Sequence, residues 1–264
     1  MLKGDDDGMA GILAGKRALV QGVLNHHSLC WGVAEALARE GAEVCLTYQN
    51  ERLREGVQEC ADSIGAWTTQ LDLQNDAEIA AVAAEVERRW GALDILVVGA
   101  AFARKEELDG EFIGVSREGF HLALDVSCYG LVALTRACRG LLRDAKGCVL
   151  TLTYIGSQRA MPNYNVMGVA KAALEASVRY LARDLGPEGV RVNAISAGPV
   201  RTVAASGVKG VGGMISETAE RAPLRQKTDR TQIGDTAAFL ASPLARGVTG
   251  EIVYVDNGLH ILGV

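Results

Sequence analysis

Short apolar runs alternate with helical patterns along most of this chain of 264 residues, and this alternation constrains the fold more than any other feature. The apolar runs are rich in β-branched residues and are predicted to be buried strands. They lie at residues 16–21, 42–48, 67–71, 93–98, 150–153, 190–195 and 251–255. Parallel strands need crossover connections, which helices usually supply. We therefore predict an α/β protein with a sheet of about seven mainly parallel strands and helices on both faces.

The first predicted strand, turn and helix are typical of a dinucleotide-binding, Rossmann-like domain. The strand ends at Gly22, and the helical pattern begins after Ser28, a good N-cap residue, and stops at Gly41. The exposed N–H groups at the start of such a helix can bind a pyrophosphate. Gly22, Ser28 and Gly32 form a longer loop than the Gly-x-Gly-x-x-Gly motif, so the prediction depends on the order of the elements.

One domain accounts for the whole pattern, since the sequence contains neither a second core nor an internal repeat. We expect this domain to span residues 10–264, after a flexible acidic tail at residues 1–9. The segment at residues 202–216 leaves a predicted strand and is rich in Gly and Ala, which suits a mobile substrate lid. A flexible linker is the alternative for this segment, but a domain boundary there would split one sheet.

Composition and charge exclude several classes of protein. The net charge of −5 gives no basic surface for nucleic acid. The six cysteines form no Cys-x-x-Cys pair and have no ligand-like spacing with the four histidines, which argues against a metal site and a disulfide framework. No apolar stretch reaches the length of a membrane span, and no signal peptide opens the chain. We expect a cytoplasmic protein with free thiols and with no metal, nucleic-acid or membrane partner.

Tyr164 and Lys171 are the main catalytic candidates. An apolar strand is followed by a break at Gly156 and Pro162 and then by an Ala-rich helix that contains both residues. They are seven residues apart, two helical turns, so they share a face with Cα atoms about 10 Å apart. Lys171 can reach back toward the ring of Tyr164, where an ammonium group would favour the phenolate. The spacing alone leaves open a tyrosine on a helix face beside a solvated lysine.

Further candidates lie where predicted strands end, the edge at which open α/β sheets bind ligands. Tyr154 follows the strand at residues 150–153 and can point into the same space as Tyr164. Gln49 is neutral and can hydrogen-bond ribose hydroxyls, which favours NADH over NADPH. Asp72 can accept a hydrogen bond from an adenine amino group or can be only a helix-entry aspartate. The small residues of 99–103 would let a cofactor approach the backbone.

With these residues in place, the sequence resembles the enoyl-acyl-carrier-protein reductases, the divergent branch of the short-chain dehydrogenase/reductase superfamily. The resemblance covers nearly everything from about Gly15 onward, and the Tyr-x6-Lys spacing separates this branch from relatives with Tyr-x3-Lys. The segments that carry it are Gly22-Val23 with Ser28, Tyr48-Gln49-Asn50, Pro162 to Gly168 with Lys171, Gly186 to Pro199, and Arg201-Thr202 with Ala204 to Gly207.

The resemblance implies hydride transfer from NADH to the β-carbon of a trans-2-enoyl thioester, the last step of fatty-acid elongation, in an enzyme that is usually a homotetramer. Tyr164 would donate to the thioester carbonyl, Lys171 would hold the nicotinamide ribose, and Tyr154 would be a second phenol in the site. The resemblance also implies further contacts to the cofactor and the substrate. The pyrophosphate side would be contacted by Gly22, Ser28 and Leu29, and the adenosine by Gln49, Asp72 and Leu73. Other parts of the cofactor would be contacted by Ala100, Val200 and Thr202, and the substrate by Ala103.

The sequence departs from the family pattern at two places that bear on the substrate. Ala101 stands where the family keeps Gly, which we expect to narrow the space for flat ligands stacked on the nicotinamide. Residues 208–214 retain only Lys209 where relatives often carry a basic cluster for the acidic carrier protein. A coenzyme A thioester therefore stands beside the carrier-protein thioester as a candidate substrate.

Two other functions stay open. One is a reductase of the same fold that acts on a ketone or on another activated alkene, and the other is a nucleotide-binding regulatory protein without turnover. The presence of both Tyr164 and Lys171 disfavours the second.

Overall fold

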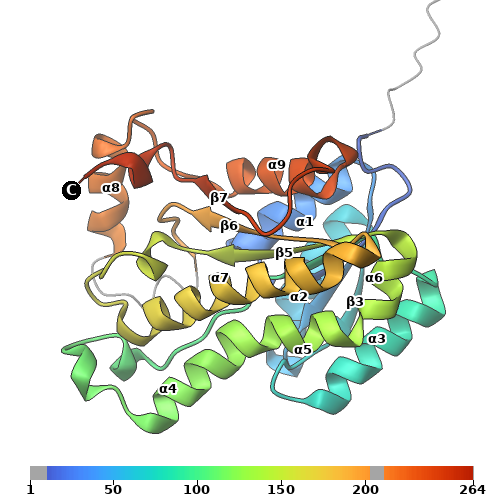
Figure 1. Cartoon of the computed structure of the whole chain (residues 1–264), viewed down its shortest axis with the longest axis horizontal. Helices are drawn as coiled ribbons and strands as arrows, with labels where there is room; N and C mark the ends of the chain where they lie inside the picture. The colour runs from blue at the N-terminus through green and yellow to red at the C-terminus, as the bar shows by residue number, and fades with distance from the viewer. Residues whose placement is uncertain (1–10, 203–210, 264) are drawn as a thin grey trace, which may run out of the picture.

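The computed structural model describes residues 11–202 and 211–263, and its strands form one sheet (Figure 1). The strands are β1 (Arg17–Gln21), β2 (Glu43–Tyr48), β3 (Trp67–Gln70), β4 (Ile95–Val98), β5 (Cys148–Thr153), β6 (Arg191–Ala197) and β7 (Ile252–Val255). Their order across the sheet is β3-β2-β1-β4-β5-β6-β7, and each neighbouring pair is parallel. The predicted α/β fold with seven mainly parallel strands is confirmed.

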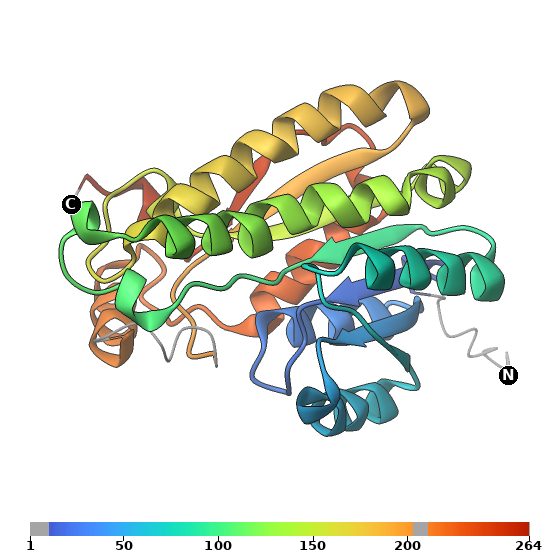
Figure 2. The ribbon, with the colours of Figure 1, turned by 90° about the horizontal axis from the view of Figure 1, so that it is seen from below.

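Helices cover both faces of the sheet (Figures 1 and 2). They are α1 (Leu29–Arg39), α2 (Glu51–Ile64), α3 (Asp76–Trp90), α4 (Arg117–Leu124), α5 (Gly130–Ala137), α6 (Arg139–Ala145), α7 (Asn165–Leu185), α8 (Val211–Arg221) and α9 (Arg230–Ala241). α1, α2 and α9 share one buried core with Ala18 and Val20 of β1, whereas α3, α5 and α7 share another with Leu19. Successive strand residues are thus buried on opposite faces, which explains the continuous apolar runs in the sequence.

The direction of strand addition reverses between β3 and β4, so the carboxyl ends of β1 and β4 meet in the middle of the sheet. Open α/β sheets bind ligands at such a switch point. Gly22, directly after β1, has a φ of 109°, and a Cβ there would lie 2.9 Å from the carbonyl carbon of Gly99, directly after β4. Only glycine combines this backbone conformation with this close approach.

The helical stretch from Arg117 to Ala145 is not one continuous helix. A π-helical turn at Asp125–Tyr129 separates α4 from α5, and Cys138 separates α5 from α6. Ser127 in this turn accepts a hydrogen bond of 2.9 Å from the backbone N–H of Phe102 in the loop after β4. Single π-helical turns within helices often occur at functional sites, and this one fixes a loop beside the switch point.

Two predicted segments lie wholly or partly outside the described residues. The acidic tail at residues 1–9 is outside them, as are residues 203–210 of the predicted lid. Residues 211–216 of that lid are the start of α8, so the described part of the segment is helical. The mobile lid itself stays a prediction. None of the helices in the described part of the chain has both the length and the hydropathy that a membrane span needs.

Candidate active site

Two tyrosine rings lie edge to face at the carboxyl end of β5. Tyr154 follows β5, and Tyr164 is the N-cap residue of α7. Their ring centroids are 5.1 Å apart and their planes make an angle of 69°. A Cβ at Gly156 would lie 2.6 Å from Cδ1 of Tyr164 and 3.1 Å from Cδ1 of Tyr154, so the glycine leaves the room that both rings need. In the sequence this glycine indicates only the end of a strand.

Lys171 lies on the buried side of α7, with 5% of its surface exposed. Its Nζ donates a hydrogen bond of 2.7 Å to the carbonyl oxygen of Leu152 in β5. Burial lowers the pKa of Lys171 to about 8, against the opposing influence of Cys30, Cys128 and Glu175. The alternative of a solvated lysine is therefore excluded, and the amine is charged at neutral pH.

The predicted influence of Lys171 on Tyr164 is wrong. Burial, followed by the neighbouring Tyr154 and Glu175, raises the pKa of Tyr164 above the ordinary tyrosine value. The ammonium group is instead directed at a backbone carbonyl of β5. Tyr164 is thus held as a neutral phenol, which can donate a hydrogen bond.

A buried carboxylate lies one helical turn beyond Lys171. Glu175 is 5% exposed, and its Oε1 accepts hydrogen bonds from Oγ1 of Thr153 at 2.8 Å and Oγ of Ser157 at 2.5 Å. These bonds join α7 to both sides of Tyr154. The only sequence signal for Glu175 is its spacing of four residues from Lys171, which places the two on one helix face.

Ser28 occupies the N-cap position of α1, as predicted, but its side chain does not cap the helix. Its Oγ accepts hydrogen bonds from the backbone N–H groups of Leu24 and Asn25, at 2.9 and 3.3 Å, because the preceding loop turns back over it. Within the described residues, the first turn of α1 from Leu29 onward therefore has no side-chain cap. Uncapped N–H groups at a helix start are suited to a pyrophosphate.

Gly99, the first of the small residues at 99–103, packs against a buried thiol. A Cβ at this position would overlap Sγ of Cys30 in α1, so only glycine fits there, and the approach of a cofactor to this backbone stays a prediction. The next residue, Ala100, is half-buried, and its N–H donates to Oε1 of Gln21 at 3.0 Å. This bond joins the ends of β4 and β1 at the switch point.

The structure brings two of the predicted adenosine residues together. Nε2 of Gln49, after β2, donates to Oδ2 of Asp72, after β3, at 3.2 Å. Oδ1 of Asp72 accepts from the N–H of Gln74 at 3.0 Å, whereas Asn75 is the residue that caps α3. Asp72 thus shapes the turn before the helix and is not its cap. Leu73 is buried in the core, so only its backbone is available to a ligand.

A small apolar cluster lies beside Tyr164. Ala101 and Ala103 of the loop after β4 pack against it together with the Tyr164 ring. Its fully buried members are Leu108, Ala123, Val166, Met167 and Ala170. The predicted substrate contact Ala103 and the extra methyl of Ala101 are therefore near the phenol.

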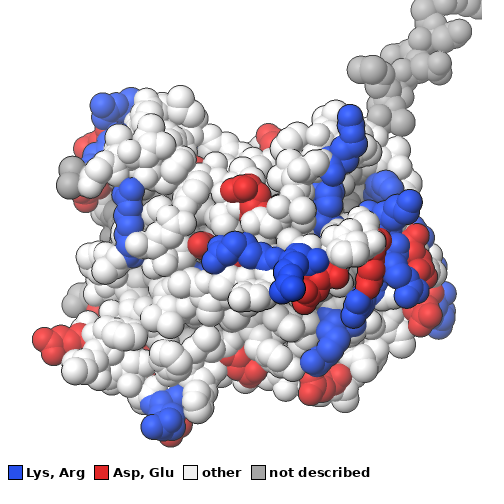
Figure 3. Space-filling view, viewed as in Figure 1, with Lys and Arg blue, Asp and Glu red and all other residues white. Residues whose placement is uncertain are grey.

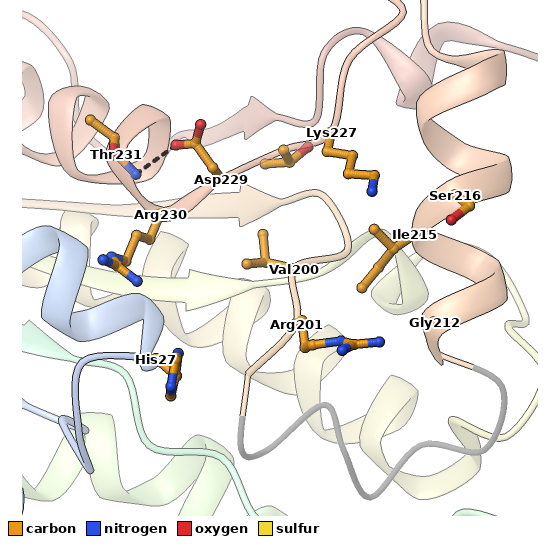
Figure 4. A pocket seen from close by; sticks show the side chains of 11 residues that line it. His27, Val200, Arg201, Gly212, Ile215, Ser216, Lys227, Asp229, Arg230 and Thr231 are labelled. Carbon is orange, nitrogen blue, oxygen red and sulfur yellow. Dashed lines mark hydrogen bonds between the residues drawn. The ribbon is translucent and has the colours of Figure 1, made fainter.

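Val200, after β6, lines a pocket of about 690 Å³ that also reaches His27, immediately before α1 (Figure 4). Thr202 is half-buried and is the last residue described before residues 203–210. The pocket therefore extends along the ends of the sheet strands from the predicted nicotinamide side toward the predicted pyrophosphate side.

The polar groups of this site fit those of a dinucleotide. The uncapped start of α1 can accept a pyrophosphate, and the Gln49–Asp72 pair offers hydrogen-bonding groups at the adenosine side. Across residues 11–202 and 211–263, no group of three or more His, Cys, Asp or Glu side chains is placed to hold a metal ion. The six cysteines are free thiols.

Comparison with known proteins identifies the family. A model of the enoyl-(acyl carrier protein) reductase family matches residues 22–260. The chain is 47% identical over 255 residues to the NADH enoyl-[acyl-carrier-protein] reductase of Bacillus cereus, covering 96% of this chain and 99% of the relative. It is 47% identical over 253 residues to that of Escherichia coli, covering 95% and 96%.

Solved structures agree with this result. The crystal structure of the NADH enoyl-[acyl-carrier-protein] reductase from Aquifex aeolicus matches with a TM-score of 0.93 at 45% identity, covering 96% of this chain and all of that one. The Bacillus cereus reductase with NADP+ and indole naphthyridinone matches with a TM-score of 0.94 at 47% identity, again covering 96% of this chain and all of that one. The chain belongs to the enoyl-(acyl carrier protein) reductase family.

Proposed function

We propose that this protein reduces the C2–C3 double bond of trans-2-enoyl thioesters by hydride transfer from NADH, the last step of fatty-acid elongation. The observation that carries this proposal is the neutral phenol of Tyr164, packed edge to face with Tyr154 at the start of the helix that holds the buried Lys171. Membership of the reductase family supports the same reaction.

The role of Tyr164 follows from where charge develops. A dinucleotide held here would supply a hydride to the β-carbon of the substrate, and the negative charge that develops would lie on the thioester carbonyl oxygen. A phenol that donates a hydrogen bond to this oxygen stabilises the enolate more than the ground-state carbonyl. The raised pKa of Tyr164 keeps the proton on the phenol so that it can make this bond. Tyr154 forms the adjacent wall of the site.

Lys171 acts through position and charge. One of its three N–H donors goes to Leu152, which leaves the others for the hydroxyls of the nicotinamide ribose. Gly22, Ser28 and Leu29 would hold the pyrophosphate through the start of α1, with Ala100, Val200 and Thr202 along the nicotinamide half.

The adenosine side favours NADH. The carboxylate of Asp72 lies 3.2 Å from Gln49, and both, with the backbone of Leu73, are proposed to contact the adenosine. A negative charge at this place would repel the extra phosphate of NADPH. The substrate enters beside Ala103, as an acyl-carrier-protein or coenzyme A thioester.

We further propose a cytoplasmic homotetramer. Free thiols suit a reducing compartment, and the described surface presents large apolar side chains on one helical layer, at Tyr129, Val169 and Tyr180. Light scattering after gel filtration would give the mass of four chains, and a monomer would contradict the proposal.

The reaction is tested by following the loss of reduced-nicotinamide absorbance with an enoyl thioester, with a ketone and without substrate. Turnover only with the thioester, and faster with NADH than with NADPH, is the expected result. Turnover of the ketone alone would identify a ketone reductase, and the absence of turnover with every substrate would contradict an enzymatic function.

A further inference from the structure

Three cationic side chains line one pocket without a partner. The pocket has a volume of about 690 Å³ and lies between the end of β6, α8 and the start of α9 (Figure 4). Its cations are Arg201, Lys227 and Arg230, and none of them forms an ion pair or a side-chain hydrogen bond with another described residue. Unpaired cations around a concave surface attract anions.

The carboxylate in the lining is already engaged. Oδ1 of Asp229 accepts hydrogen bonds from the N–H groups of Thr231 and Gln232 at 2.8 and 3.1 Å, and the Gln232 side chain accepts from the N–H of Asp229 at 3.1 Å. This capping box satisfies the start of α9. These N–H groups at the start of α9 are therefore not available to bind an anion. The pocket is lined by three cationic side chains and by one carboxylate, that of Asp229.

The side chains approach the pocket from different sides. In Figure 4, Lys227 enters from one side and Arg201 from the other, near Ile215 of α8. Arg230 lies toward the other end, with His27 close to the start of α1. The guanidinium group of an arginine can donate two parallel hydrogen bonds to a phosphate, and the ammonium group of a lysine adds a compact positive charge.

We propose that this pocket binds a phosphate ester group, separate from the pyrophosphate site at the start of α1. The proposal rests on the enoyl-thioester reduction proposed above, because the thioester substrate of that reaction carries a phosphate at the end of its pantetheine arm, as in coenzyme A. The lid segment retains only Lys209, so this pocket supplies positive charge that the lid sequence lacks.

The test uses a double variant, Lys227→Gln with Arg230→Gln, which removes two charges and keeps much of each side-chain stem. Arg246→Gln is the control for charge, since it removes an exposed cation beyond the far end of α9, outside the pocket. KM is measured for NADH, for an enoyl coenzyme A thioester, and for the same enoyl group on pantetheine without phosphate.

We expect the double variant to raise KM about tenfold for the coenzyme A thioester and to leave KM for the phosphate-free thioester within about twofold. A rise for the coenzyme A thioester alone supports the proposal. A rise in KM for NADH would overturn it, because the only phosphates of NADH are those of its pyrophosphate. Unchanged KM for the coenzyme A thioester, or an equal rise for the thioesters with and without phosphate, would overturn the proposal.

Direct binding separates this inference from the proposed reaction. Inorganic phosphate is titrated calorimetrically into the unmodified protein, the double variant and the Arg246→Gln control. Weaker binding in the double variant alone supports the phosphate site even if no thioester is reduced. Equal binding by all three proteins would overturn it even in an active reductase.

Discussion

Tyr164 shows how burial decides the chemistry of a single residue. The phenol lies beside Tyr154 and above Gly156, and removal from water raises its pKa. A tyrosine activated as a phenolate would lose the proton that a developing oxyanion needs, whereas a neutral phenol keeps it. The raised pKa therefore supports the proposed role of Tyr164 as a hydrogen-bond donor to the substrate carbonyl.

Tyr164→Phe removes that donor and leaves the ring. We expect kcat to fall about a hundredfold, with KM for NADH nearly unchanged, because the lost hydrogen bond acts on the transition state. Steady-state kinetics with an enoyl thioester measures both constants. Equal losses in kcat and in cofactor affinity would contradict the role as donor to the substrate.

Lys171 gives the reaction a pH dependence. Burial lowers its pKa to about 8, so the amine loses its charge as the pH rises through that value. We expect KM for NADH to rise about fivefold on the alkaline side, since hydrogen bonds from a charged donor are stronger than those from a neutral one. Initial rates at varied NADH concentration and pH test this, and a flat profile through pH 8 would contradict it.

Lys171 also affects the stability of the native chain. The effect has the opposite sign to that of a lysine whose pKa is raised on folding, because burial lowers the pKa of Lys171. Between the native pKa of about 8 and the ordinary value of 10.5, the unfolded chain holds this proton and the native chain does not. This group therefore makes the native chain more stable as the pH rises across that interval.

At the scale of elements, α7 and the end of β5 form one unit joined by Glu175. Its carboxylate accepts from Thr153 and Ser157 on either side of Tyr154, and its charge raises the pKa of Lys171 one turn away. The same carboxylate thus holds the tyrosine segment and supports the charge on the lysine. It is a positioning residue, because it acts through the other two.

Glu175→Gln keeps an oxygen that can accept from Thr153 and Ser157 but removes the charge. The pKa of Lys171 should then fall further, and the alkaline rise in KM for NADH should begin below pH 8. The pH profile of the variant is compared with that of Glu118→Gln, an exposed site on α4. A purely structural role would lower stability and leave the position of the rise unchanged.

Gly156 sets the distance between these elements. In Gly156→Ala the added methyl would lie 2.6 Å from the Tyr164 ring, so the ring must move. We expect kcat to fall about tenfold, since small displacements of a catalytic group are costly. Gly140→Ala is the matched control, because nothing lies within 4 Å of a Cβ there. Equal activity of the two variants would show that the ring adapts without cost.

The sequence predicts the elements better than the contacts between them. Apolar runs and the spacing of Tyr164 and Lys171 indicate strands and a shared face, because these are local patterns. The hydrogen bond from Thr153 to Glu175, and the close packing of Cys30 against Gly99, join residues far apart in the chain. Such contacts depend on how the elements pack, which local patterns do not determine.

Over the whole molecule, the two ends of the sheet strands have different roles. The carboxyl ends hold Tyr154 and the candidate cofactor residues, whereas the charged side chains visible in Figure 3 gather near α3 and α6. The ion pairs of these two helices include Arg139 of α6 with Glu188 and Arg89 of α3 with Glu85. Exposed pairs of this kind contribute little each to the free energy of unfolding.

Asp94, at the amino ends of the strands, forms ion pairs with Lys16 and Arg17 that are more buried than the surface pairs of α3 and α6. It precedes β4, is 6% exposed, and accepts hydrogen bonds from Nε of Arg17 at 2.7 Å and Nζ of Lys16 at 3.0 Å. Burial alone would raise the pKa of Asp94, but the bonds from Arg17 and Lys16 together hold it below the ordinary value. The carboxylate thus stabilises the native chain above the ordinary aspartate pKa, and this contribution is lost as the pH falls through the lowered value.

Asp94→Asn should therefore separate stability from catalysis. We expect the free energy of unfolding at neutral pH to fall by about 2 kcal/mol, less than for a fully buried pair because both cations are partly exposed. Because the neutral amide no longer titrates, the difference from the unmodified protein should shrink in acid. kcat should stay the same, since Asp94 lies at the strand ends opposite Tyr154 and Lys171. Denaturant unfolding at two pH values and steady-state kinetics test both parts, and a lower kcat at unchanged stability would contradict this division of roles.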